Sequence, residues 1–406
     1  MKPSFSTRPR TILICGGAII MLSLGIRHGF GIFLRPMTSD LQWTRETFAF
    51  AIALQNLVWG ISQPFMGMIA DRFGAGRVLV VGAVAYASGL ALMAESTTGL
   101  GLAVSAGLLI GLGLSGTYTI VIGVVGRVFP PEQRSVALGI LSALASFGQF
   151  AMLPYGQSLI SGVGWWWALL ILAANACLMI PLAMPLARAR SHSLPGRTEP
   201  KQTVRAALVE ARSHRGFWLV TLGFFVCGFQ VVFVATHLPA YLLDQGMSVD
   251  TGMLALALIG LANIPGSFLA GYLGARFSKR LLLASIYLAR AAIIAAFVSL
   301  PVTPFTVYAF AVALGMVWLG TVPLTSGIVA QVFGVQYLSM LFGIVYLGHQ
   351  IGAFLGGWAG GYAYDVSGSY VSVWLTAIGL SLVAAVANWL ADESAAARLR
   401  TAPATT

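Results

Sequence analysis

The stretch Gly67–Arg77, with the sequence GMIADRFGAGR, decides the fold because a weaker copy, GYLGARFSKR at Gly271–Arg280, follows 204 residues later. The same ungapped offset relates further landmarks: Asp40 and Asp244, Gly123 and Gly327, Val128-Phe129 and Val332-Phe333, Gly139-Ile140 and Gly343-Ile344, and Gly148 and Gly352. Glycine matches alone arise easily in a chain with 47 glycines, but one constant offset across many landmarks does not. The chain therefore consists of two sequence-related halves.

The composition places both halves in lipid. Hydrophobic residues make up 58% of the 406 residues and charged residues only 9%, whereas a soluble domain carries about 25% charged residues. A spanning helix needs about 20 predominantly apolar residues. Runs of this kind lie at 11–34, 47–70, 77–96, 99–127, 134–160, 165–187, 217–243, 251–275, 281–300, 304–333, 338–363 and 371–391. We therefore predict an all-α polytopic membrane protein with twelve transmembrane helices, arranged as two parallel six-helix repeats.

A long polar segment separates the halves. Residues 188–216 are rich in arginine and contain Pro195, Gly196 and Pro200, which predicts a linker with a surface helix near 201–213. The linker joins an N-terminal six-helix bundle, residues 1–187, to a C-terminal bundle, residues 217–406. Six crossings in each half give the two repeats the same orientation and put both termini on the side of the linker.

The distribution of positive charge orients the chain. All but four of the 23 Lys and Arg residues lie on the side of the linker; the exceptions are Arg27 and Arg290 within spans, and Arg35 and Arg45 opposite. Positive residues mark the cytoplasmic face, so we expect both termini in the cytoplasm of a multi-pass protein of the bacterial inner membrane. The net charge of +11 then reflects topology and requires no nucleic-acid partner.

The first apolar run and the cysteines narrow the class further. The run 11–34 is too long for a typical signal-peptide core, so we expect it to be the first span. Cys15, Cys177 and Cys227 all lie in apolar runs, which favours small buried residues over a disulfide or metal set. The sequence has no nucleophile–base set and no G-x-x-x-x-G-K-[ST] motif. We expect neither an enzyme nor a cofactor.

The motif at Gly67–Arg77 resembles the loop signature G-x-x-x-D-R-x-G-x-R-R of the major facilitator superfamily, and with the repeat and linker the resemblance covers nearly the whole chain. It implies a transporter that works by alternating access and functions as a monomer. It also implies a conformational latch at Gly67, Asp71, Arg72 and Arg77. A carboxylate at a helix end can meet a helix dipole and nearby arginines. The alternative is an ordinary helix-end ion pair worth about 0–1 kcal/mol.

Two further stretches resemble the bacterial monocarboxylate and oxalate–formate transporter branch. They are Gly25–Leu34 in the first span and Gly343–Gly352 in the eleventh. The resemblance places His28 where monocarboxylate transporters carry a functional lysine, and His349 where the oxalate transporter carries a substrate-binding lysine. Both groups also use an arginine in the eighth span, where this chain has Ser267 after Asn263. We expect Arg27 to supply that charge from another helix.

The polar residues deep in the predicted spans favour an anionic ligand. The cations are Arg27 and Arg290, and no Asp or Glu lies deep in any predicted span. An intramembrane ionisable residue costs about 2.5–3.5 kcal/mol on insertion scales and is a functional candidate by default. A pocket with unpaired cations attracts anions.

We expect a substrate site formed by polar residues from both halves, namely Arg27, His28, Tyr118, Gln149, Asn263, His349 and Gln350. His237, beside Pro239 near the outer end of the seventh span, is expected to be an outer gate residue. Arg290 lies in the ninth span, which is peripheral in the family, and is either a structural or a substrate-contacting residue. No metal ligands are predicted.

These observations predict a secondary transporter of small organic anions, in particular monocarboxylates. Histidine titrates near neutrality, so His349 and then His28 are the candidate proton carriers of a symporter; exchange or uniport is the alternative. Vesicle uptake under an imposed pH gradient distinguishes these modes. Two other functions stay open: proton-coupled drug efflux, which usually requires a membrane carboxylate, and a transporter-like sensor, which would carry a signalling domain.

Overall fold

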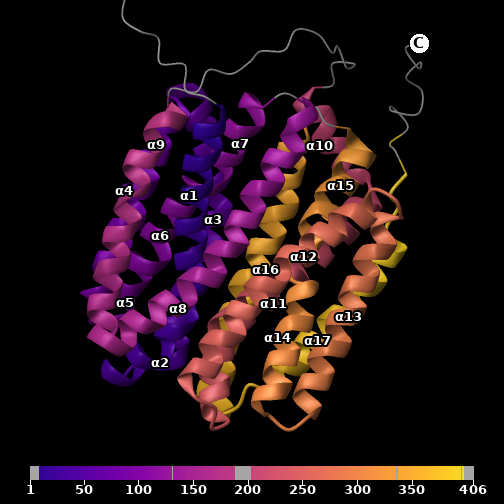
Figure 1. Ribbon diagram of the computed structural model, residues 1–406. Helices are drawn as coiled ribbons and strands as arrows, with labels where there is room; N and C mark the ends of the chain where they lie inside the picture. Colours follow the sequence, from indigo (N-terminus) through magenta and orange to yellow (C-terminus); the bar gives the residue numbers. More distant parts are fainter. Residues whose placement is uncertain (1–8, 130, 188–202, 335–336, 395, 397–406) are drawn as a thin grey trace, which may run out of the picture.

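A computed structural model describes residues 9–129, 131–187, 203–334, 337–394 and 396. Long helices run roughly side by side through the molecule, and the described residues contain no strand (Figure 1). The start of α1, the surface helix α10 and the end of α17 lie at the same end of the molecule (Figure 1). The predicted all-α polytopic architecture is therefore confirmed.

The first half is an array of helices between Pro9 and Ala187. Its elements are α1 (Pro9–His28), α2 (Phe30–Asp40), α3 (Arg45–Phe73), α4 (Ala75–Ala94), α5 (Gly99–Leu102), the π-helical η1 (Ala103–Leu109), α6 (Ile110–Ser115), α7 (Tyr118–Val128), α8 (Pro131–Cys177) and α9 (Met179–Ala187). Gly74 ends α3 at a φ of 96°, and Gly164 interrupts α8 at a φ of 85°. These left-handed conformations favour glycine and mark the turns between predicted spans.

The second half repeats this order after the surface helix α10 (Val204–Ser213). Its elements are α11 (Arg215–Asp244), α12 (Val249–Gly274), α13 (Lys279–Ser299), α14 (Pro304–Met316), α15 (Thr321–Phe333), α16 (Leu338–Ser367) and α17 (Val371–Leu390). Side-chain caps begin several of them; for example, Ser248 accepts from the backbone of Thr251, and Thr303 forms a capping box with Thr306. Such caps satisfy N–H groups that the first helical turn leaves unpaired.

The helices are consistent with twelve crossings. Ten stretches of the described residues are long and apolar enough to span a membrane, and one of them, Gly139–Ala187, has 49 residues. That stretch contains the turn at Gly164 and suffices for two crossings. Helix α3 is not among the ten, although its 29 residues are long enough to span. Its polar residues Gln55, Asn56 and Gln63 lower its hydropathy.

The repeat is visible in the packing. A Cβ on Gly148 would lie 2.4 Å from the carbonyl oxygen of Met21, which shows how closely α8 approaches α1. A Cβ on Gly352 would lie 2.0 Å from the carbonyl oxygen of Phe225, where α16 crosses α11. Both the glycines and their partners are 204 residues apart in the sequence. Small residues allow such close backbone approach in membrane helix pairs, so the repeated glycines have the same packing role in each half.

Candidate functional site

The two halves touch along α3 and α16 over part of their length. A Cβ on Gly361 would lie 2.7 Å from Ala49, and one on Gly60 would lie 2.6 Å from Gln350. Further along, at Gly67 of α3 and Gly343 of α16, an added Cβ would meet no atom of another described segment within 4 Å. The helices are therefore in contact toward the end that holds Arg45 and separate toward the end that holds the linker helix α10.

An ion pair closes the first end. The Arg45 guanidinium donates to both carboxylate oxygens of Asp244 at 2.5 and 2.8 Å, and to the hydroxyl of Tyr370 at 2.9 Å. It also lies 3.6 Å from the ring centroid of Tyr364. The carboxylate of Asp365 accepts the backbone N–H groups of Arg45 and Glu46 at 3.2 and 2.7 Å. This group joins the start of α3 to the ends of α11 and α16, and we name it the outer clamp after the side of the membrane that the positive residues predict for it.

Burial raises the pKa of Tyr370 to about 12. Its phenol therefore stays protonated at neutral pH and can accept from Arg45 without adding a second negative charge beside Asp244.

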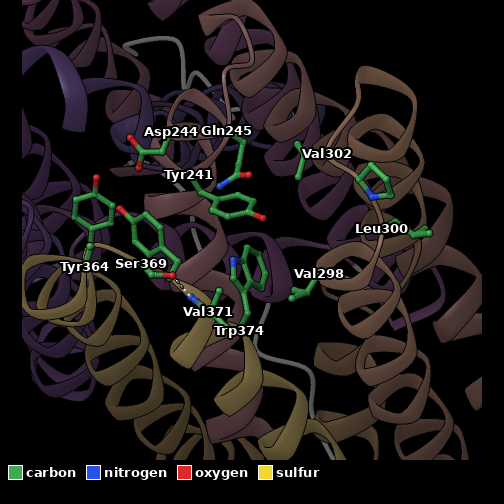
Figure 2. Close-up of a pocket in the computed structure, with 13 residues that line it drawn as sticks. Tyr241, Asp244, Gln245, Val298, Leu300, Val302, Tyr364, Ser369, Val371 and Trp374 are labelled. Carbon is green, nitrogen blue, oxygen red and sulfur yellow. Dashed lines mark hydrogen bonds between the residues drawn. The ribbon is translucent and has the colours of Figure 1, made fainter.

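A cavity of about 330 Å³ lies beside the clamp (Figure 2). Figure 2 shows Asp244, Gln245 and Tyr241 at one side of it and Trp374 at another. All of its lining residues belong to the second half, between Tyr241 and Trp374. The cavity thus lies within the second half, next to the clamp residues Asp244, Tyr364 and Tyr370.

His237, the predicted outer gate residue, is buried next to Tyr370 of the outer clamp. Its Nε2 lies 2.7 Å from the carbonyl oxygen of Gly357 in α16, and its ring centroid lies 5.4 Å from that of Tyr370. Within the described residues its Nδ1 has no hydrogen-bond partner. His237 therefore packs behind the outer clamp and does not join it directly.

Arg27 lies near the end of α1, where that helix faces α3. Its Nη2 donates to Asn56 Oδ1, and its guanidinium carbon lies 5.3 Å from the ring centroid of Trp59. Its Nη1 lies 3.5 Å from His28 Nε2, while His28 Nδ1 is 2.7 Å from the carbonyl oxygen of Leu24. This pattern fits a His28 tautomer that donates from Nδ1.

Part of the Arg27 guanidinium is unsatisfied. Its Nε is buried and has no hydrogen-bond partner among the described residues, nor do these residues include an ion pair to Arg27. On the side toward Gln55 and Thr236, the adjoining cavity measures only about 10 Å³. That space is about enough for one water molecule.

The second half meets Arg27 and Asn56 through α16. Gln350 Nε2 donates to the backbone oxygen of Asn56 at 3.0 Å, and Gln350 Oε1 accepts a hydrogen bond from His349 Nδ1 at 3.0 Å. The structure therefore brings the predicted residues Arg27, His28, His349 and Gln350 to one contact between the halves. Asn56 connects the two sets.

Aromatic residues surround this contact, and sequence reasoning missed most of them. Trp59 lies at centroid distances of 6.3 Å from Tyr118 and 5.8 Å from Tyr346. Tyr346 stacks on His349 at 5.5 Å with an interplanar angle of 11°. Among Trp59, Tyr118 and Tyr346, only Tyr118 was a predicted site residue. Trp59 and Tyr346 occupy positions in apolar spans that look like ordinary packing residues, so no sequence signal distinguished them.

Gln149 and Asn263 lie in a second contact between the halves, where α8 meets α12. Gln149 Nε2 donates to the carbonyl oxygen of Leu256 at 3.3 Å, and Asn263 Nδ2 donates to Ser146 at 3.1 Å. Asn263 Oδ1 also accepts the backbone N–H of Leu319 at 3.0 Å. Both amides are buried and hydrogen-bonded across this contact, so the structure does not bring them to the Arg27 contact.

Arg290 is buried inside the second half. Its Nε and Nη2 donate to the carbonyl oxygen of Val317 at 3.0 and 2.8 Å, and Nη2 also donates to that of Trp318. Its Nη1 donates to Gln230 at 3.2 Å. These carbonyls lie at the break between α14 and α15, where the helix leaves them without intrahelical partners.

The predicted latch lies at the open end. Gly76 brings α4 so close to Ala187 that a Cβ would stand 2.0 Å away, and Arg77 is exposed in the first turn of α4. Gly67 has open space around it. The side chains of Asp71 and Arg72 lie outside the described part of the structure, so the latch stays a prediction.

Comparison with known proteins agrees with this architecture. The family model described as Major Facilitator Superfamily matches residues 13–333 and 255–405. An uncharacterized MFS-type transporter of Bacillus subtilis, YcxA, is 24% identical over 392 residues, which cover 91% of this chain and 92% of the relative. Monocarboxylate transporter 13 of Bos taurus is 24% identical over 362 residues, covering 88% and 83% of the two chains.

The solved structures agree as well. A bacterial homolog of the human lysosomal transporter Spinster, in an inward-facing and occupied conformation, superposes with a TM-score of 0.73 at 16% identity, covering 94% of this chain and 96% of that one. A second structure of a bacterial Spinster homolog, in an inward-facing and unoccupied conformation, gives a TM-score of 0.71 at 17% identity, covering 96% of this chain and 97% of that one. Because the family model matches nearly the whole length of this chain, the chain belongs to the major facilitator superfamily.

Proposed function

We propose that this transporter moves small organic anions, in particular monocarboxylates, by alternating access, and that Arg27 binds the carboxylate. The observation that carries the proposal is a guanidinium at the contact between the halves, with a buried Nε that no described residue satisfies. Removing a charge from water is costly unless it finds a partner. A substrate carboxylate offers that partner in a bidentate geometry.

The surroundings of Arg27 favour an anion over a cation. The polar side chains that contact it, Asn56 and His28, carry no negative charge. Asp244 and Asp365 are second-half carboxylates that bind Arg45 of the first half, and both lie in the outer clamp. A drug-efflux carrier that takes up cations would need an acidic group near the site, which this arrangement lacks among its described residues.

The relatives support the same substrate class. Several of them, including proteins from Bos taurus, Rattus norvegicus and Mus musculus, are named monocarboxylate transporters. Their identity to this chain is 23–26%, so the names support the proposal together with the Arg27 geometry.

The geometry also bears on which conformational state of the alternating-access cycle the structure corresponds to. The outer clamp is closed, and α3 and α16 separate toward Gly67 and Gly343. With the linker end in the cytoplasm, as the positive residues predict, the structure corresponds to an inward-facing state. A substrate would then reach Arg27 from the cytoplasmic side.

Titration of purified protein with acetate, pyruvate and benzoate, and with tetraethylammonium as a cationic control, tests the proposal. The carboxylates should bind to the wild type, and Arg27→Gln should weaken their binding at least about tenfold, since a charge-assisted hydrogen bond contributes about 1.5–3 kcal/mol. Arg27→Lys should retain part of the affinity because it keeps the charge but loses the bidentate fork.

Arg35→Gln is the matched control, because Arg35 lies in α2, just beyond the predicted first span, its side chain is 43% exposed, and it lies 3.9 Å from Asp244. It should bind carboxylates like the wild type. Binding of tetraethylammonium alone, or undiminished carboxylate binding by a folded Arg27→Gln protein, would refute the proposal.

A further inference from the structure

We infer that the preferred substrate is an aromatic monocarboxylate, whose ring lies against Tyr118 and Tyr346 while its carboxylate meets Arg27 and the indole N–H of Trp59. This inference rests on the proposed function and specifies the substrate class of the same site. It follows from the side chains that surround the guanidinium.

The aromatic side chains come from both halves. Trp59 belongs to α3, Tyr118 begins α7, and Tyr346 belongs to α16. Trp59 makes edge contacts with both tyrosines, at interplanar angles of 88° with Tyr118 and 66° with Tyr346. Aromatic rings prefer such edge-to-face and offset arrangements, so a substrate ring could extend the same pattern.

The cluster continues deeper into the second half. Phe224 of α11 lies 4.8 Å from the ring of His349 and 5.9 Å from Phe342, and both distances join ring centroids. Phe224 is only 1% exposed, whereas Tyr118, Phe342 and Tyr346 are partly buried. The partly exposed rings can therefore contact a ligand, and the buried ring supports them from behind.

Two nitrogen donors at this cluster have no partner. They are Arg27 Nε and Trp59 Nε1, both buried and without a hydrogen-bond acceptor among the described residues. A buried, unpaired donor is unfavourable. A carboxylate has two oxygens, so it can satisfy the guanidinium and leave an acceptor for the indole. This places the charged end of the substrate between α1 and α3.

The charge balance favours a single negative charge on the substrate. Arg27 is the one arginine that the structure describes at this contact. The other arginine within a predicted span, Arg290, donates instead to the carbonyls of Val317 and Trp318. A second carboxylate would have to lie against the aromatic rings, whose faces carry negative potential. A dicarboxylate should therefore bind more weakly than a monocarboxylate of the same ring size.

The test compares four acids with wild-type protein at neutral pH: benzoate, cyclohexanecarboxylate, acetate and phthalate. Benzoate and cyclohexanecarboxylate both present one carboxylate on a six-membered ring, so their affinity ratio isolates the contribution of the aromatic ring. Benzoate should bind at least about tenfold more tightly than acetate, which corresponds to about 1.4 kcal/mol. Benzoate should also bind at least about threefold more tightly than either cyclohexanecarboxylate or phthalate.

Tyr346→Leu should remove the preference for benzoate over cyclohexanecarboxylate and leave acetate affinity unchanged. The matched control is Tyr362→Leu on the same helix, because Tyr362 is 48% exposed and pairs with Trp358. It should keep the wild-type ratio. Since the comparison of four acids uses the wild type, it stands even if Tyr346→Leu fails to fold.

The outcomes separate this inference from the proposed function. Carboxylates that bind without a preference for benzoate would refute the aromatic substrate and leave the anion transporter standing. Phthalate binding as tightly as benzoate would refute the single-charge requirement. If no carboxylate binds to wild-type protein, both the inference and the proposed function are wrong.

Discussion

At the scale of single residues, Arg27 and Arg290, the two arginines within predicted spans, differ in which of their donors lack a partner. Arg290 donates to the carbonyls of Val317 and Trp318 and to Gln230, and it is only 1% exposed. Its position matches Tyr86 of the first half at the 204-residue offset, and Tyr86 also donates to a backbone carbonyl, that of Ser23. The repeat therefore supports a structural role for Arg290, whereas Arg27 retains a free donor.

Arg290→Met should lower the thermal stability of the purified transporter and leave its carboxylate affinity unchanged. The substitution leaves the carbonyls of Val317 and Trp318 without donors, and an unsatisfied buried group costs about 1–3 kcal/mol. Thermal unfolding and carboxylate titration of the same preparation measure the two effects. Lost affinity at unchanged stability would instead assign Arg290 to the substrate.

The residue scale also shows what sequence could not predict. Arg27, His28, His349 and Gln350 were predicted because polar groups are conspicuous in apolar spans. Trp59 and Tyr346 were missed because an aromatic residue in a span looks the same whether it packs against a helix or faces a ligand. Gln149 and Asn263 were polar and equally conspicuous, but only the packing of α8 on α12 shows that they are hydrogen-bonded to the opposite half.

At the scale of elements, the spans were largely predictable because hydropathy and length are local properties. The predicted span 11–34 extends to Asp40 through α2, and Gly164 marks the turn expected between 134–160 and 165–187. The contacts between elements were not predictable, because they depend on tertiary geometry. The outer clamp is the clearest case, since Arg45 and Asp244 are distant in sequence and lie at the ends of different helices.

Arg45→Gln should allow the outer end to open more often. The pair with Asp244 is mostly buried, with side-chain exposures of 6% and 19%, so its loss should cost about 1–3 kcal/mol, between the values for exposed and buried pairs. A cysteine placed at Ala49, which lies beneath the clamp against Gly361, reports the opening. Its labelling from outside by an impermeant thiol reagent should become about tenfold faster.

Arg35→Gln provides the control for this measurement. Arg35 lies 3.9 Å from the same carboxylate, but its side chain is 43% exposed, so its loss should change the labelling rate little. Equal rates in Arg45→Gln and the wild type would show that the clamp does not hold the two halves together.

At the scale of the whole molecule, the orientation in the membrane follows from charge and is open to a direct test. The linker helix α10, the start of α1 and the end of α17 lie at one end of the molecule (Figure 1). The start of α3 and the end of α11, which carry the outer clamp, lie at the other end (Figure 1). The sequence predicts that most Lys and Arg residues lie at the first end, and positive residues stay on the cytoplasmic side during insertion. We therefore expect α10 in the cytoplasm and Gln245, beside the clamp, outside.

Single cysteines at Ser213 in α10 and at Gln245, in a protein with the three native cysteines replaced, measure this orientation. Both positions are exposed, so a difference in labelling reports the side of the membrane and not burial. An impermeant reagent added to intact cells should label the cysteine at 245 and reach that at 213 only after the membrane is opened. Labelling at 213 in intact cells would invert the topology, and the substrate path to Arg27 would then open to the outside in this state.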